Sequence, residues 1–172
     1  MNKKKIYIIV LLVFLMFLIL CMKNLFINDI REVAISNNNI EKFNDHLLRE
    51  GKYKISLPEG WEIDEKNSNH NSDININFND KNNINGSISI IEGNIEEVIK
   101  GIAIKDYSIK IIDDYDYTWN IICSNDKKSI NNKYYLRKYS EGKVLMIKYS
   151  YEMGKEKSSI NVVFDTIAKS FE

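Results

Sequence analysis

The stretch KYYLRKYSEGKVLMIKYSY, residues 133–151, decides the fold. It divides at Glu141-Gly142 into two segments, Lys133 to Ser140 and Lys143 to Tyr151, and tyrosine, which suits a pleated surface, is frequent in both. The second segment alternates, with Leu145, Ile147, Tyr149 and Tyr151 on one side and Val144, Met146 and Lys148 on the other. The stretch therefore predicts an antiparallel β-hairpin, with the turn at Glu141-Gly142.

The segment that follows this hairpin changes from a period of two to the period of a helix. Its apolar residues fall on one stripe, with polar residues opposite: Ile160, Val163, Phe164, Ile167 and Phe171. We expect a helix over Ser158 to Phe171 that covers one face of the sheet.

An earlier hairpin is predicted by alternating isoleucines. One face of its first strand carries Ile74, Ile76 and Phe78, and one face of its second carries Ile84, Ile88 and Ile90. Residues 79–83 join the two strands, and Asn85-Gly86 is an alternative turn position.

Asn94 opens a short helix, since its side chain can accept from backbone N–H groups in the first turn, where Glu97 is placed to complete a capping box. The expected buried stripe is Ile95, Val98, Ile99 and Ile102.

Two more strands follow, at Ile109 to Ile112 and around Trp119. In the second strand Tyr117, Trp119, Ile121 and Cys123 are expected to face the core. We expect Cys123 to be buried as a small apolar residue.

The N-terminus is the most apolar part of the chain. Ile6 to Met22 (IYIIVLLVFLMFLILCM) contains no charge, Gly or Pro, and three lysines precede it. As a helix this run is about 25 Å long, slightly less than the roughly 30 Å of a bilayer core, so we expect the span to extend to Ile27. The sequence predicts a transmembrane anchor within residues 1–27.

Two other readings of this segment stay open, namely lipidation at Cys21 and cleavage as a signal peptide. Basic residues near a span tend to remain cytoplasmic, and Lys3 to Lys5 outnumber Lys23. The expected location is therefore the cell membrane, crossed once, with the N-terminus cytoplasmic and the C-terminal domain outside.

Residues 28–50 are interpreted as a tether, broken by three asparagines at 37–39. Ile40, Phe43, Leu47 and Leu48 then predict a short helix that contains His46 and ends at Gly51. Residues 51–172 form the expected α+β domain.

The balance of 24 basic and 24 acidic residues is uneven along the chain, because four of the basic residues flank the apolar run and no acidic residue precedes Asp29. Residues 28–172 thus carry 20 basic and 24 acidic side chains. Such a domain has no bulk attraction for nucleic acid.

Two small clusters are candidate sites. Asp113, Asp114 and Asp116 are weak candidates for a metal site, but the residues that follow depart from a calcium loop, with Trp119 where glycine is needed. We expect no metal, cofactor or catalytic residue. Three tyrosines, Tyr134, Tyr135 and Tyr139, could form a partner surface, against the simpler reading that they pack within the sheet.

The stretch YKISLPEGWEI, Tyr53 to Ile63, contains a strand that ends in a Pro-Glu-Gly turn, and the chain closes on FDTIAKSFE. With the order of elements between them, these motifs resemble the bacterial membrane-anchored relatives of PsbP, an extrinsic subunit of photosystem II. The resemblance covers Tyr53 to Phe171. It implies an antiparallel sheet of about six strands flanked by helices, an αβα sandwich whose known members mainly bind partners.

The sequence contains no phosphate-binding glycine loop, no paired Cys or His at metal spacing and no nucleophile elbow. We therefore expect a membrane-anchored extracytoplasmic binding or accessory module, whose partner is an envelope protein or a surface ligand. Two alternatives stay open: a surface hydrolase that uses carboxylates such as Asp113, Asp114 or Asp116, and a small accessory subunit of a membrane complex.

Overall fold

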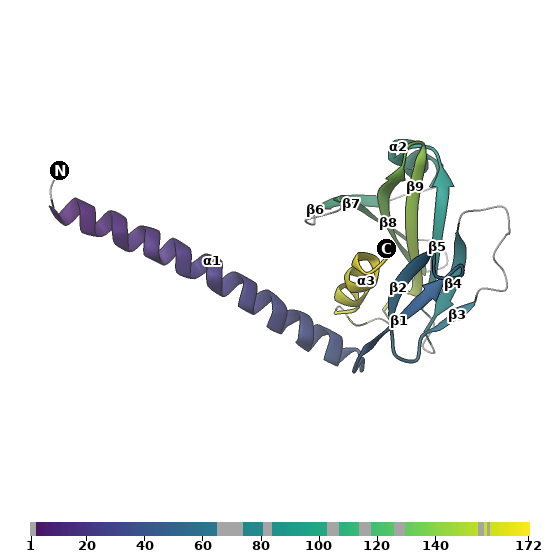
Figure 1. Cartoon of the computed structure of the whole chain (residues 1–172), viewed down its shortest axis with the longest axis horizontal. Helices are drawn as coiled ribbons and strands as arrows, with labels where there is room; N and C mark the ends of the chain where they lie inside the picture. The colour runs from purple at the N-terminus through teal and green to yellow at the C-terminus, as the bar shows by residue number, and fades with distance from the viewer. Residues whose placement is uncertain are drawn as a thin grey trace.

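The computed structural model describes residues 3–64, 74–80, 84–102, 107–113, 118–125, 130–154, 157 and 159–172. In these ranges the chain forms a long N-terminal helix and an α+β domain of two antiparallel sheets and two helices (Figure 1). The fold class predicted from the sequence is confirmed for the domain.

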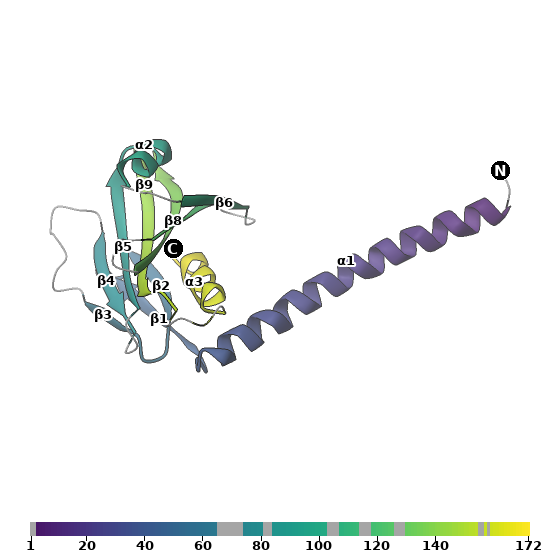
Figure 2. The same ribbon diagram turned by 180° about the vertical axis from the view of Figure 1, so that it is seen from behind.

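The N-terminal helix, α1 (Lys3–Asn37), is continuous through the expected anchor and the expected tether. It ends at the three asparagines, where Asn39 takes a positive φ of 58°. Figures 1 and 2 show that α1 projects away from the domain and approaches it only at its C-terminal end, near α3 (Ile160–Lys169). Among the residues that the structure describes, no helix is long and apolar enough to cross a membrane.

The short helix predicted after the asparagines is wrong. Residues Phe43–Leu48 form strand β1, which pairs with β2 (Tyr53–Pro58) in a two-stranded sheet, and His46 lies on this strand. Asp45 of β1 accepts a hydrogen bond from the hydroxyl of Ser56. Its Oδ2 also forms an ion pair with Nζ of Lys54 at 2.9 Å. These cross-strand contacts favour the strand, and Gly51, with a φ of 85°, lies in the hairpin turn instead of ending a helix.

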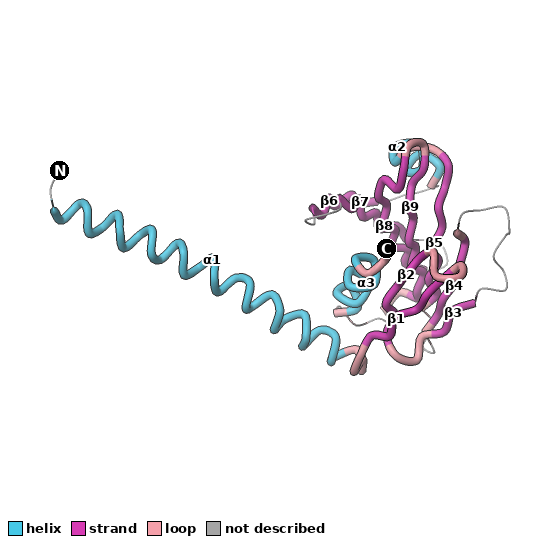
Figure 3. Tube along the Cα trace, in the orientation of Figure 1, coloured by secondary structure: helices cyan, strands magenta, loops and turns pink. Residues whose placement is uncertain are grey.

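The main sheet has seven strands in the order β3-β4-β5-β9-β8-β7-β6, where the sequence predicted about six (Figure 3). Its strands are β3 (Glu62–Asp64), β4 (Asn75–Asn79), β5 (Asn85–Glu92), β6 (Tyr107–Asp113), β7 (Thr118–Asn125), β8 (Ile130–Ser140) and β9 (Lys143–Glu152). Both predicted hairpins are present, and β8 turns into β9 through Glu141-Gly142. Asn85-Gly86 lies within β5 and is not a turn.

Gly86 shows how closely this sheet is packed. A Cβ atom at Gly86 would lie 2.0 Å from Cε2 of Phe78, its partner across β4 and β5. The ring of Phe78 therefore occupies the space that any larger residue at position 86 would need.

Two clusters of apolar side chains lie on opposite faces of this sheet. The larger one joins the sheet to β2 and α3, and it buries all five residues of the predicted α3 stripe. The smaller one is built on Ile122, Leu136 and Val144, against which α2 (Ile95–Gly101) packs. The domain is thus layered, with α3 and the β1–β2 hairpin on one face and α2 on the other.

A local sequence signal begins α2, and a long-range backbone contact follows α3. The predicted capping box of α2 is present, since Asn94 accepts from the Glu97 amide at 2.9 Å and Glu97 accepts from the Asn94 amide at 3.1 Å. Beyond α3, the backbones of Glu172 and Lys54 exchange two hydrogen bonds of 3.0 Å. These bonds join the end of the chain to β2.

Candidate functional site

Two buried basic side chains distinguish the α3-facing side of β8. Lys133 is 7% exposed and Arg137 is 5% exposed. Alternate residues of a strand point to the same face, so Lys133 and Arg137 share this face with Tyr135. A buried cation requires charged or polar partners within the fold.

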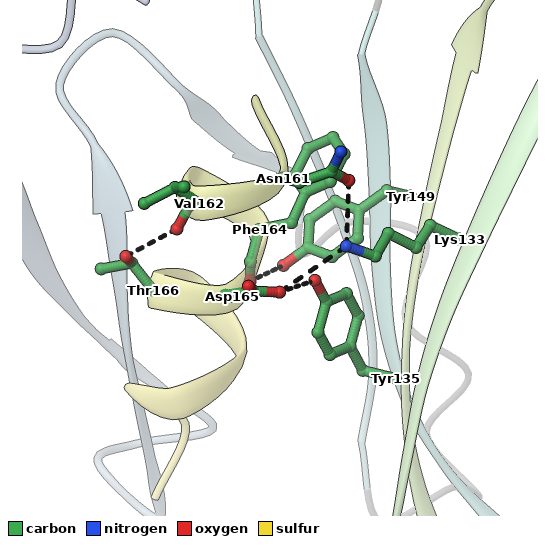
Figure 4. Close-up of polar contacts among 8 residues, drawn as sticks. All are labelled: Lys133, Tyr135, Tyr149, Asn161, Val162, Phe164, Asp165 and Thr166. Atoms are coloured by element: carbon green, nitrogen blue, oxygen red, sulfur yellow. Dashed lines mark hydrogen bonds and ion pairs between the residues drawn. The ribbon is translucent and has the colours of Figure 1, made fainter. Parts of the chain in front are cut away.

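Lys133 obtains these partners from one side of α3 (Figure 4). Its Nζ donates to Oδ1 of Asn161 at 2.9 Å and lies 3.6 Å from Oδ1 of Asp165. Residues four apart on a helix lie one above the other, which places these two acceptors together. The ring of Tyr135 adds a cation–π contact, with its centroid 4.9 Å from Nζ.

Two tyrosine hydroxyls complete the cluster. The hydroxyl of Tyr135 donates to Oδ1 of Asp165, and that of Tyr149 donates to the backbone carbonyl of Phe164 at 3.3 Å. Burial, and then the nearby negative charge of Asp165, raise the pKa of Tyr135 far above the ordinary value of 10.0. The same two causes raise the pKa of Tyr149. Both phenols therefore remain neutral donors.

Arg137 forms a second link between β8 and the end of α3. Its Nη2 donates to the carbonyl oxygen of Phe171 at 2.8 Å, and its guanidinium carbon lies 4.9 Å from the centroid of the Trp119 ring. On β9, Tyr149 lies opposite Lys133, and its ring stacks on that of Phe164 with centroids 4.0 Å apart. We call Lys133, Tyr135, Arg137, Asn161 and Asp165 the β8–α3 polar cluster.

The chemistry of this cluster is that of an internal bridge. The carboxylate of Asp165 is engaged by a lysine ammonium and a phenol, and both come from β8. Lys133 and Asp165 therefore link β8 to α3 within the fold. In the described part of the chain, no group of three or more His, Cys, Asp or Glu side chains is placed to hold a metal ion.

The residues predicted as an acidic site are only partly described. Asp113 ends β6, where its backbone lies opposite Thr118 of β7. Asp114 and Asp116 lie outside the described residues. The acidic site predicted at these three positions therefore stays a prediction.

The three predicted surface tyrosines do not share one surface. Tyr135 is 2% exposed and belongs to the core, whereas the half-buried Tyr134 packs with the cluster under α2, on the opposite face. Tyr139 is exposed at the end of β8, where its hydroxyl lies 3.5 Å from that of Tyr53. Cys123, expected in the core, is exposed.

A second candidate site is the surface of α1. The described apolar side chains from Ile6 to Leu20 are all at least 40% exposed. The helix contacts the domain at its other end, where Asn38 donates to Oγ of Ser159 at 2.9 Å and Lys157 donates to the carbonyl of Asn37. Ala34, buried at this junction, marks the side of α1 that faces the domain.

Sequence reasoning missed the β8–α3 polar cluster. Its members are separated by up to 32 positions, so that only the tertiary fold brings them together. One signal was present in the sequence. Lys133 and Arg137 alternate with Tyr134 and Leu136, so they share the strand face of Tyr135, and charged residues are rare on a strand face that a helix covers.

No protein-family model and no curated protein matches this sequence. Among solved structures, the solution structure of cyanobacterial PsbP (CyanoP) from Synechocystis sp. PCC 6803 is similar, with a TM-score of 0.51 and 16% identity, over 77% of this chain and 93% of that one. A crystal structure from Bacteroides thetaiotaomicron VPI-5482 matches with a TM-score of 0.50 and 10% identity, over 74% of this chain and 47% of that one. This chain has a PsbP-like fold.

Proposed function

We propose that the protein is an accessory binding module that α1 attaches to a membrane. The observation that carries this proposal is the contrast between two buried cations, Lys133 and Arg137, that contact acceptors within the domain, and a helix whose apolar side chains from Ile6 to Leu20 are all exposed. Each large apolar side chain that leaves water contributes about 1.5–3 kcal/mol. An apolar surface of this size requires an apolar environment that the domain does not supply.

The anchor that we propose runs from Ile6 to Ile27. It includes Cys21 and Leu25, whose side chains lie outside the described part of the chain. As a helix this segment is about 33 Å long, which matches a bilayer core of roughly 30 Å. Lys3 to Lys5 before it favour a cytoplasmic N-terminus, so the domain is proposed to lie outside the cytoplasm.

A binding role, as opposed to catalysis, is supported by how the domain uses its polar groups. Lys133 and Asp165 are each engaged across the α3 interface, and Arg137 is engaged by the end of α3. Groups held in this way join α3 to the sheet, which leaves them occupied within the fold. The PsbP-like fold is compatible with this role, although a fold alone does not assign one.

Vesicle flotation tests the attachment. The full chain is expected to float with phosphatidylcholine vesicles at both low and high salt, because the contact is apolar. Replacing Leu12 and Leu15 by aspartate introduces two charges at mid-membrane depth, which cost about 2.5–3.5 kcal/mol each, and should abolish flotation. The control, Asn28→Asp, places a charge beyond the anchor and should float. Flotation of the double variant equal to the unaltered chain would contradict the proposal.

Crosslinking of the intact protein in its native membrane tests the binding role. We expect recovery of a second, different envelope protein that is lost when exposed residues of the domain, such as Tyr139, are changed. Recovery of this chain alone would count against a separate partner.

Protease added to intact cells tests the orientation. It should digest the domain, and survival of the domain would overturn the proposed orientation.

A further inference from the structure

The backbone at the end of α1 leads directly into the packed domain. Asn39 takes a positive φ of 58°. Its amide donates to the carbonyl of Ser36 at 2.9 Å, and the amide of Ile40 donates to the carbonyl of Ile35 at 3.4 Å. A left-handed residue with these two bonds is a Schellman motif, which ends a helix and satisfies its last carbonyls. The next residue, Ile40, packs against the larger core cluster, so the chain passes from the helix straight into core packing.

Two side-chain contacts add to this backbone connection, and both involve residues at or just before the start of α3. Nδ2 of Asn38 donates to Oγ of Ser159 at 2.9 Å and to the carbonyl of Ala34 at 2.7 Å. The ammonium of Lys157 donates to the carbonyl of Asn37. We call Asn37, Asn38, Lys157 and Ser159 the α1–α3 latch.

The charges at the latch are complementary. The last carbonyls of a helix carry partial negative charge, which a basic side chain in the last turn can offset. The last turn of α1, residues 34–37, contains no basic residue, and Lys157 of the domain takes this place. Ser159 is the N-cap of α3, so the negative end of α1 meets the positive end of α3. Ala34 is buried at the same junction.

The segment expected to be a tether is helical as far as Asn37. Beyond an anchor that ends at Ile27, residues 28–37 are about 15 Å long as a helix. Figures 1 and 2 show α3 on the side of the domain that faces α1, and strands β3 and β4 on the opposite side. A helix joined firmly to the domain would therefore determine how the domain is directed.

We propose that α1 and the domain form one rigid unit, in which the α1–α3 latch fixes the orientation of the domain relative to its anchor. The latch keeps the β3–β4 edge of the main sheet directed away from the membrane, and it limits which face of the domain a partner in that membrane can reach. The direction relative to the membrane rests on the attachment proposed above. The rigidity of the unit does not.

Distances between pairs of nitroxide labels, measured by double electron–electron resonance, test the latch. In the full chain with Cys21→Ser and Cys123→Ser, labels at positions 32 and 62 report from α1 to β3, and labels at positions 62 and 138 report within the domain. Labelled chain is diluted with unlabelled chain and measured both in phosphatidylcholine vesicles and in detergent micelles. Both pairs should give one narrow distance distribution in either medium.

The variant Asn38→Ala with Lys157→Ala removes the side-chain contacts of the latch. It should widen the 32–62 distribution several-fold, while the 62–138 distribution stays narrow because the domain remains folded. The matched control, Asn28→Ala with Lys100→Ala, removes the same two residue types at exposed positions and should leave both distributions unchanged.

The outcomes separate this proposal from the membrane attachment. A broad 32–62 distribution in the unaltered chain overturns the rigid unit, and a narrow one that the double variant leaves unchanged overturns the role of the latch. Both results are also read in micelles, so they do not depend on attachment. Flotation of the same chain tests the attachment: its loss, with a narrow 32–62 distribution, overturns the attachment and supports the rigid unit.

Discussion

Helices α1 and α3 are both rich in Ile, Val and Phe, yet one is exposed and the other is buried. In α3 the apolar residues occupy one stripe, and all of this stripe is covered by the sheet and β2. In α1 the apolar residues surround the helix, and Ala34, near its end, is buried against the domain. The arrangement of apolar residues around a helix, more than their number, thus decides which surroundings the helix requires.

A matched pair of Phe→Ala changes should show the largest difference between the two helices. Phe164 is fully buried and stacks on Tyr149, whereas Phe17 is 63% exposed. Phe164→Ala should lower the free energy of unfolding of the domain by about 3–5 kcal/mol, because a cavity replaces the ring. Phe17→Ala should leave it unchanged. Urea denaturation of the full chain in mild detergent, followed by tryptophan fluorescence, measures the free energy of unfolding of both variants. Equal losses in the two variants would contradict the difference between a buried α3 and an exposed α1.

The aspartates of the two helices should differ less. Asp165→Asn takes a charged acceptor from Lys133 and Tyr135, and should cost about 1–2 kcal/mol, since the carboxylate is partly exposed. Asp29→Asn, on the exposed part of α1, should cost nothing. The same urea titration applies. A neutral result for Asp165→Asn would mean that the β8–α3 polar cluster does not hold α3 to the sheet.

Helix α2 extends the comparison to a helix that depends on its cap. Asn94→Ala removes the acceptor for the Glu97 amide and should lower the free energy of unfolding by about 1 kcal/mol. The matched change in α1, Asn28→Ala, should have no such effect on the domain. Circular dichroism during thermal unfolding would reveal both, and an unchanged melting temperature for Asn94→Ala would contradict the role of the cap.

The smallest effect at neutral pH is expected from the buried phenols. The folded state raises the pKa of Tyr135 above its unfolded value of 10.0, so it holds this proton more tightly than the unfolded chain does. The contribution of Tyr135 to the free energy of unfolding is therefore complete below pH 10 and is lost as the pH rises further. Tyr135→Phe should make the melting temperature fall less steeply between pH 10 and 11.

Much of the domain could be predicted because its signals are local. The capping box of Asn94 and Glu97 depends on residues three apart, and the turn at Gly142 depends on neighbours. The stripe of α3 depends on a period that the sequence itself displays. These features can be predicted without knowing the rest of the fold.

The failures have a different cause. Residues 43–48 have apolar positions that suit a helix, and only pairing with β2 makes them a strand. Cys123 follows the alternation of β7, yet it is exposed, whereas Ile121 on the same face is buried. In both cases the outcome depends on elements distant in sequence: β2 pairs with residues 43–48, and no element that the structure describes buries Cys123.

The candidate site divides in the same way. The apolar surface of α1 could be predicted, because its pattern is continuous in sequence. The bridge of Lys133 and Asp165 could not, because it forms only when α3 lies across β8. Tyr135, predicted with Tyr134 and Tyr139 as a partner surface, belongs to this bridge instead.

The accessibility of a spin label on α1 tests the central claim most directly. A nitroxide at position 14, in a chain with Cys21→Ser and Cys123→Ser, is measured in vesicles by collision with oxygen and with a water-soluble nickel chelate. If α1 lies in lipid, the label should be accessible to oxygen and protected from nickel, while a label at position 32 shows the reverse. Equal access of nickel to both positions would contradict the account.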